Sequence, residues 1–178
     1  RKTMRKRLDG LRKARQNAEH LSAPLHILHM FAAARATTTA MVDLNAAVRA
    51  AVELLRLGYY RALAEPPRVV VKLAEGLPAV AGSTGLLMGI VIDLAAGGVV
   101  AQLDVATRRE GEAIITQIDV AYAEGGGKPG AEDAFAAALA AARLCGGTVG
   151  AKRAPGRHTY ALLLQTATTV QSLRSGSA

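Results

Sequence analysis

The sequence is poor in cysteine, in aromatic residues and in long apolar runs. Cys145 is the only cysteine among 178 residues, which excludes an intramolecular disulfide and a zinc site built from several thiolates. Tryptophan is absent and aromatic residues make up 3% of the chain, so the core must consist mainly of Ala, Val, Leu and Ile. No apolar run reaches the roughly 18 residues that would cross a bilayer, and the start is too basic for a signal peptide. We therefore expect a cytoplasmic protein.

Positive charge is present, but it is concentrated near the start of the chain. The formal net charge is +8, and residues 1–17 hold eight basic residues against a single acidic one, Asp9. Such a tract can bind nucleic acid or an anionic membrane surface, or it can form the solvated face of a helix or a juxtamembrane stretch. We favour the solvated or membrane-proximal interpretation, because no recognition helix or aromatic platform accompanies the tract to support a nucleic-acid partner.

Apolar residues spaced three and four apart predict one long helix over residues 8–35. The seam consists of Leu11, Ala14, Ala18, Leu21, Leu25, Leu28 and Ala32. A lone helix cannot bury such a stripe, so we expect residues 1–37 to form a homodimer through a helical bundle. Pro24 lies inside the seam and is expected to kink the helix.

Residues 38–168 alternate between helix and strand signals and are followed by a polar tail, residues 169–178. Residues 37–40 look like a polar connector; Asp43 is expected to cap a helix that ends at Gly58, and Ser83 a helix that ends at Gly97. An Ala-rich helix is predicted over residues 132–145. Strands are predicted over residues 68–73, 100–107, 113–122, 148–152 and 159–164, with a hairpin turn at residues 109–111 and a Pro-Gly turn at Pro155 and Gly156. This order predicts a two-layer α/β sandwich, a mixed sheet with helices on one face.

Several segments resemble, in the same order, parts of the ATPase domain of bacterial sensor histidine kinases. The segment VDLNAAVRAAVELL (residues 42–55) resembles the linker and first helix of that domain. LPAVAGSTGLLMGIVIDLAAGG (residues 77–98) resembles its Mg²⁺-binding helix, and LCGGTVGAKRAPGRHTYALLLQTA (residues 144–167) its closing segment. The resemblance implies a GHKL-type fold, two-component signalling, and a response-regulator receiver domain or a kinase as partner.

The segment AEHLSAPLHIL (residues 18–28) resembles the phosphoacceptor motif H-E-L-x-x-P-L of the same family. With Pro24 aligned, Glu19 takes the position of the phosphoacceptor histidine and His20 follows it. The other registration makes residues 8–35 the second helix of the dimerisation hairpin, with the first helix upstream of Arg1. We favour the second registration and keep His20 as the candidate phosphoacceptor under the first.

The motifs that bind the nucleotide in the family are altered here. The resemblance places Gly97 at the Mg²⁺-binding asparagine and Asp93 at the asparagine one turn earlier; glycine offers no ligand atom, whereas a carboxylate can bind a hard cation. In the adenine-binding motif D-x-G-x-G, Asp119 would retain the carboxylate, while Ala121 and Ala123 replace the glycines. Asp93 and Asp119 are therefore the candidate remnants of a nucleotide site.

The segment that holds the lid and a phosphate-binding glycine motif in the family is short here. Only residues 124–130 precede the Ala-rich helix, and that helix opens with Glu132 and Asp133, where phosphates would dock. We therefore predict no cofactor and a dimeric phosphotransfer or scaffold partner of response regulators. The alternatives are the catalytic fragment of a divergent active kinase, which needs ATP and Mg²⁺, and a basic-arm regulator bound to DNA or a membrane.

Overall fold

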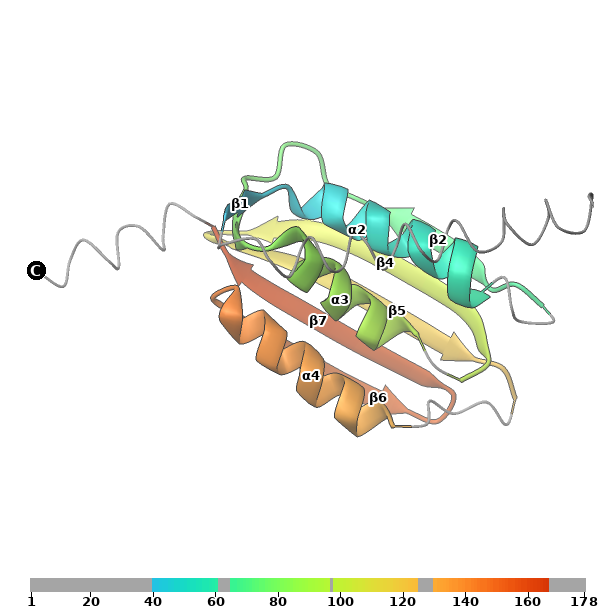
Figure 1. Ribbon diagram of the computed structural model, residues 1–178. Coiled ribbons are helices and arrows are strands. Elements are labelled where there is room, and N and C mark those ends of the chain that lie inside the picture. Colours follow the sequence, from blue (N-terminus) through green and yellow to red (C-terminus); the bar gives the residue numbers. More distant parts are fainter. Residues whose placement is uncertain (1–39, 61–64, 97, 125–129, 167–178) are drawn as a thin grey trace, which may run out of the picture.

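The computed structural model describes residues 40–60, 65–96, 98–124 and 130–166 (Figure 1). The predicted helix over residues 8–35, with His20 and Pro24, lies outside the described residues, and so does the tail. The predicted dimerisation region and the domain boundaries therefore stay predictions. Within the described ranges, no helix combines the length and the apolar character needed to cross a membrane.

Five strands form the main sheet, in the spatial order β2-β4-β5-β7-β6. Their bounds are β2 Arg68–Lys72, β4 Val100–Glu110, β5 Ala113–Tyr122, β6 Gly147–Ala154 and β7 Arg157–Gln165. Strand β2 runs parallel to β4, and the other neighbours are antiparallel. The mixed sheet predicted from the sequence is confirmed.

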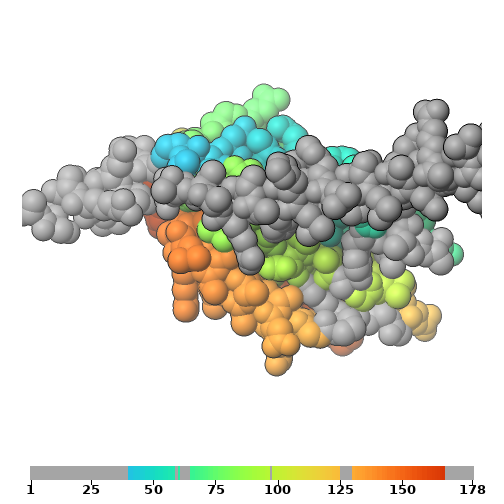
Figure 2. Space-filling view, in the orientation of Figure 1, coloured from blue at the N-terminus to red at the C-terminus, as the bar shows by residue number. Residues whose placement is uncertain are grey.

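Among the described residues, three helices cover one face of this sheet and none covers the other, which we call the open face. They are α2 (Leu44–Leu54), α3 (Thr84–Ala95) and α4 (Ala131–Leu144), which lie side by side in front of the strands (Figure 1). In the space-filling view, the atoms of α2 in cyan and of α4 in orange flank the green atoms of α3 (Figure 2). Apolar side chains from the helices and from one face of the strands form a single buried core. The predicted two-layer α/β sandwich is confirmed.

Local signals set the ends of several elements, although Ser83, at the N-cap of α3, makes no capping hydrogen bond through its side chain. Asp43 caps α2, since its Oδ1 accepts a hydrogen bond from the backbone N–H of Ala46 at 3.1 Å. Pro155 and Gly156 form the predicted Pro-Gly turn, with Gly156 at φ +69°, and the strands on either side reach closer to it than predicted. The hairpin turn between β4 and β5 lies at Gly111 and Glu112 instead of residues 109–111, because Glu110 still pairs with Ala113.

The helix that Asp43 caps was predicted to end at Gly58, but α2 itself ends four residues earlier, at Leu54. The helical chain continues from α2 through a π-helical turn, η1 (Leu55–Tyr59), that includes Gly58. Tyr60, just beyond this turn, is buried, and its hydroxyl donates to the carbonyl of Ala95 at 3.0 Å. Burial of Tyr60 and its hydrogen bond to α3 stabilise the end of the helical segment. This stabilisation is larger than the low helix propensity of the single residue Gly58.

A small second sheet was not predicted. Strand β1 (Ala40–Val42) pairs antiparallel with β3 (Val80–Gly82), where the sequence suggested a polar connector ending at residue 40. Three-residue strands are too short to show an alternating pattern. Burial of Val42 and Val80 in the common core is what fixes this pairing.

Candidate functional site

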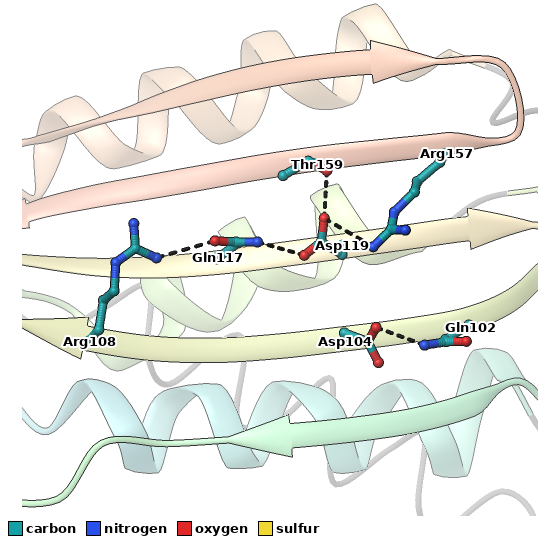
Figure 3. Close-up of polar contacts among 7 residues, drawn as sticks. All are labelled: Gln102, Asp104, Arg108, Gln117, Asp119, Arg157 and Thr159. Atoms are coloured by element: carbon teal, nitrogen blue, oxygen red, sulfur yellow. Dashed lines mark hydrogen bonds and ion pairs between the residues drawn. The ribbon is translucent and has the colours of Figure 1, made fainter.

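Asp119 lies on the open face of the sheet, away from the helices. Its neighbours in β5, Ile118 and Val120, are buried in the core beneath the helices, so the alternation of a strand turns Asp119 to the other side. Figure 3 shows its side chain in front of the strands, with the helices behind them. Asp119 is also three residues short of the end of β5 and sits directly opposite Asp104 on β4 and Thr159 on β7.

Both carboxylate oxygens of Asp119 already have partners on this face. Thr159 Oγ1 donates to Oδ1 at 2.5 Å, and Gln117 Nε2 donates to Oδ2 at 2.7 Å. The guanidinium of Arg157 lies 3.8 Å from Oδ1, and the Asp119 side chain is 15% exposed (Figure 3). The carboxylate is therefore held by its own sheet, with its hydrogen-bonding capacity largely used.

These contacts belong to a longer open-face polar strip. Its members are Gln102, Asp104, Arg108, Gln117, Asp119, Arg157 and Thr159 (Figure 3). Arg108 Nη1 donates to Gln117 Oε1 at 3.2 Å, and Gln102 Nε2 donates to Asp104 Oδ2 at 2.7 Å. Within the described residues, the buried Oδ1 of Asp104 has no hydrogen-bond partner, and no group of three or more metal-binding side chains gathers. The strip is a chain of polar side chains along neighbouring strands.

On the helix side of the sheet, the end of β5 carries an aromatic cluster made of Tyr122, Phe135, His158 and Tyr160. His158 Nδ1 lies 3.0 Å from the Tyr160 hydroxyl and 3.5 Å from the Tyr122 hydroxyl. Phe135 on α4 stacks on Tyr160, with the ring centroids 6.4 Å apart. Burial raises the pKa of the Tyr160 phenol, although Arg153 and the hydrogen bond with Tyr122 oppose the shift. These side chains fill the space between α4, the last residue of β5 and the first residues of β7.

The sequence suggested no partner for His158, and the aromatic cluster around it was not predicted. Period-two alternation puts Tyr122, His158 and Tyr160 on the same side of their strands. Their contact, however, depends on the β5–β7 register, which pairs Val120 with His158 and Ile118 with Tyr160. The paired residues of β5 and β7 lie almost 40 positions apart in the chain, so short-range sequence patterns do not determine their register.

Asp93 and Asp119 are not brought together. Asp93 is a half-buried residue of α3, in the helix layer, whereas Asp119 lies on the opposite face of the sheet. Gly97 and the glycine-rich residues 125–129 are outside the described residues. Strand β5 ends at Tyr122 and α4 begins at Ala131, so eight residues connect them. Glu132 and Asp133 occupy the first turn of α4, where their charges oppose anion binding by the helix N-terminus.

Cys145 follows α4 and is almost completely buried. Burial raises the pKa of its thiol, and a hydrogen bond with the backbone of Ser83 partly opposes this. We expect the native protein to react at least about tenfold more slowly with iodoacetamide at pH 8 than the protein unfolded in guanidinium, because the thiolate is scarce and inaccessible. Mass spectrometry would follow the single adduct over time. Equal rates in the two states would contradict this placement.

No family model matches the chain, and no curated protein matches it in sequence. Solved structures do match. The Acinetobacter baumannii histidine kinase AdeS aligns with a TM-score of 0.50 and 14% identity, over 84% of this chain and 80% of that one. The catalytic domain of the histidine kinase ThkA, in a nucleotide-free form, aligns with a TM-score of 0.53 and 10% identity, over 73% of this chain and 97% of that one.

Full-length ShkA, solved in complex with AMPPNP, aligns with a TM-score of 0.50 and 17% identity. The match covers 84% of this chain but 36% of ShkA, so the chain spans about a third of that protein. At such low identity, these similarities concern the fold and not the chemistry. The chain has the GHKL-type α/β fold of histidine-kinase catalytic domains.

Proposed function

We propose that this chain is a two-component signalling protein that does not bind ATP and acts through contacts with protein partners. The observation that carries the proposal is the position of Asp119, the residue aligned with the adenine-binding aspartate. Its carboxylate faces away from the helices and is engaged by Thr159 and Gln117. A nucleotide held by α3 on one side of the sheet cannot also reach a carboxylate on the other side.

Two further features support the absence of a nucleotide site. The eight residues between β5 and α4 are few for a lid that closes over a triphosphate. The acidic first turn of α4 also replaces an anion-binding helix start with two negative charges. The aromatic cluster meanwhile fills the helix side of the β5 end, where Tyr122 and His158 contact each other.

The partner assignments rest on the sequence resemblance. We propose a homodimer formed through residues 8–35, docking with a response-regulator receiver domain or with a partner kinase in the cytoplasm. Under the registration that aligns Pro24 with the phosphoacceptor motif, His20 would exchange a phosphoryl group with the receiver aspartate. Under the other registration, the dimer acts as a scaffold.

The second candidate function is the catalytic part of a divergent active kinase, with ATP and Mg²⁺ as cofactors. It is favoured by the similarity in fold to ShkA, whose structure contains AMPPNP.

Equilibrium dialysis of the full chain against radiolabelled ATP and Mg²⁺ separates the two proposals, because an active catalytic part must bind the nucleotide whichever helix carries the phosphoacceptor. We expect equal ATP concentrations on the two sides of the membrane, because the carboxylate of Asp119 faces away from α3 and is engaged by Thr159 and Gln117. ATP that is retained with the protein and displaced by excess unlabelled ATP would support the second candidate and overturn the proposal.

A further inference from the structure

An open groove lies between the helical segment made of α2 and η1 and the edge strand β2. It has a volume of about 490 Å³ and is lined by Arg49, Val52, Glu53, Arg56, Val71 and Leu73. A neighbouring hollow of about 340 Å³ shares Arg56 and continues the groove past Val69 to Tyr60 and the two prolines before β2. Figure 1 shows α2 running alongside this edge of the sheet. The groove combines an apolar floor with a charged rim.

Strand β2 presents a free backbone edge to this groove. It is the terminal strand of the sheet, and among the described residues it pairs only with β4. The carbonyl of Val69 accepts a hydrogen bond from Arg56 Nη2 at 3.5 Å, which places that carbonyl on the groove side. Because residues two apart in a strand present their peptide groups to the same side, Val71 offers its N–H and C=O there as well. A free edge of this kind can pair with another strand.

The charges along the edge restrict which strand can pair there. Arg68 and Lys72 are exposed and lie on the open-face side of β2, and Arg49 lies on the rim of the groove. None of the three forms an ion pair within the described part of the chain. Glu53, in contrast, forms an ion pair with Arg56, in which Oε1 and Nη1 lie 2.8 Å apart. Antiparallel pairing of two β2 strands would bring Arg68 of one copy near Lys72 of the other, and like charges that face each other are destabilising. A second copy of this chain is therefore a poor occupant.

We propose that the β2 edge and its groove bind an extended segment of a partner protein in which acidic and apolar residues alternate. Added as a further strand beside β2, the segment turns its apolar side chains over Val71 and Leu73 and its carboxylates toward Arg68 and Lys72. The backbone of β2 supplies the hydrogen bonds. Charge complementarity sets the choice of partner. This site does not involve the nucleotide-related residues and is independent of the proposed function.

Fluorescence anisotropy with synthetic peptides tests the proposal. The probe is a fluorescein-labelled peptide of alternating Glu and Val, seven residues long, titrated with the full chain. We expect saturable binding that weakens with salt. The matching Lys-Val peptide should bind at least about tenfold more weakly, because its charges repel the edge. A Glu-Val peptide that is N-methylated at every residue should lose affinity to a similar degree, because it keeps the side chains but cannot donate to the β2 backbone in either strand orientation.

Surface variants provide the matched test on the protein. The Arg68→Glu/Lys72→Glu variant should bind the Glu-Val peptide at least about tenfold more weakly and should prefer the Lys-Val peptide. Lys152→Glu makes the same kind of change on β6, the opposite edge of the sheet, and should leave both affinities unchanged within about twofold. The proposal is overturned if the Glu-Val peptide does not bind at millimolar protein. It is equally overturned if N-methylation or the charge reversal leaves binding unchanged.

Discussion

Gly147→Ala is expected to lower the free energy of unfolding by about 3 kcal/mol. Gly147 opens β6, and a Cβ placed there would lie 2.4 Å from the carbonyl oxygen of Leu163 and 2.6 Å from a methyl group of Leu164. The nearer atom belongs to the backbone of the adjacent strand β7, so a change of side-chain rotamer cannot relieve the contact. The start of β6 must shift away from β7 and weaken their pairing.

Gly150→Ala is the matched control, because it makes the same substitution in the same strand. A Cβ at Gly150 meets nothing within 4 Å, so the free energy of unfolding should change by no more than about 0.5 kcal/mol. Guanidinium denaturation followed by circular dichroism would measure both variants. Equal stability of the two would contradict the close approach of β6 and β7.

Asn45→Ala is expected to cost about 2 kcal/mol of stability. Asn45 Nδ2 donates to the carbonyl of Ala74 at 2.7 Å, and its Oδ1 accepts from Thr107 Oγ1 at 2.9 Å. Thr107 Oγ1 in turn accepts from the N–H of Ala74 at 3.0 Å. This closed set joins α2, β4 and the segment after β2. Removal of the amide leaves a carbonyl and a hydroxyl without these partners in a partly buried site.

Glu53→Ala is the control on the same helix. It removes an exposed ion pair with Arg56 and should change stability by less than about 1 kcal/mol. The double variant Asn45→Ala/Thr107→Val should cost less than the sum of the single variants, because both remove the same hydrogen bond. Strict additivity in urea denaturation would show that the two side chains do not interact.

The fold was predictable where short-range signals carry it. Asp43 before an apolar helix, and Pro155 with Gly156 between two strands, each act within a few residues, and the structure confirms them. The small sheet of β1 and β3 and the continuation through Gly58 depend instead on distant partners such as Tyr60 with Ala95. Contacts between residues so far apart in the chain cannot be predicted from short-range sequence patterns.

In the candidate site, too, some features follow from short-range sequence patterns and others depend on the pairing of distant strands. The face on which Asp119 lies follows from its alternation with Ile118 and Val120, so the sequence contained that information. Its hydrogen bond with Thr159 and the meeting of Tyr122 with His158 require the register of β5 on β7, which the sequence does not specify. The role of Asp119 as a remnant of a nucleotide site stays a prediction, because the structure shows only its partners within the sheet.

Isothermal titration of the full chain with ATP and Mg²⁺ tests the central claim most directly. We expect no heat beyond dilution, which corresponds to a dissociation constant weaker than about 1 mM. ShkA, which was solved with AMPPNP, is the positive control for the fold. Micromolar binding of ATP that AMPPNP displaces would contradict the account, because it would require a nucleotide site that does not depend on the carboxylate of Asp119 as placed here.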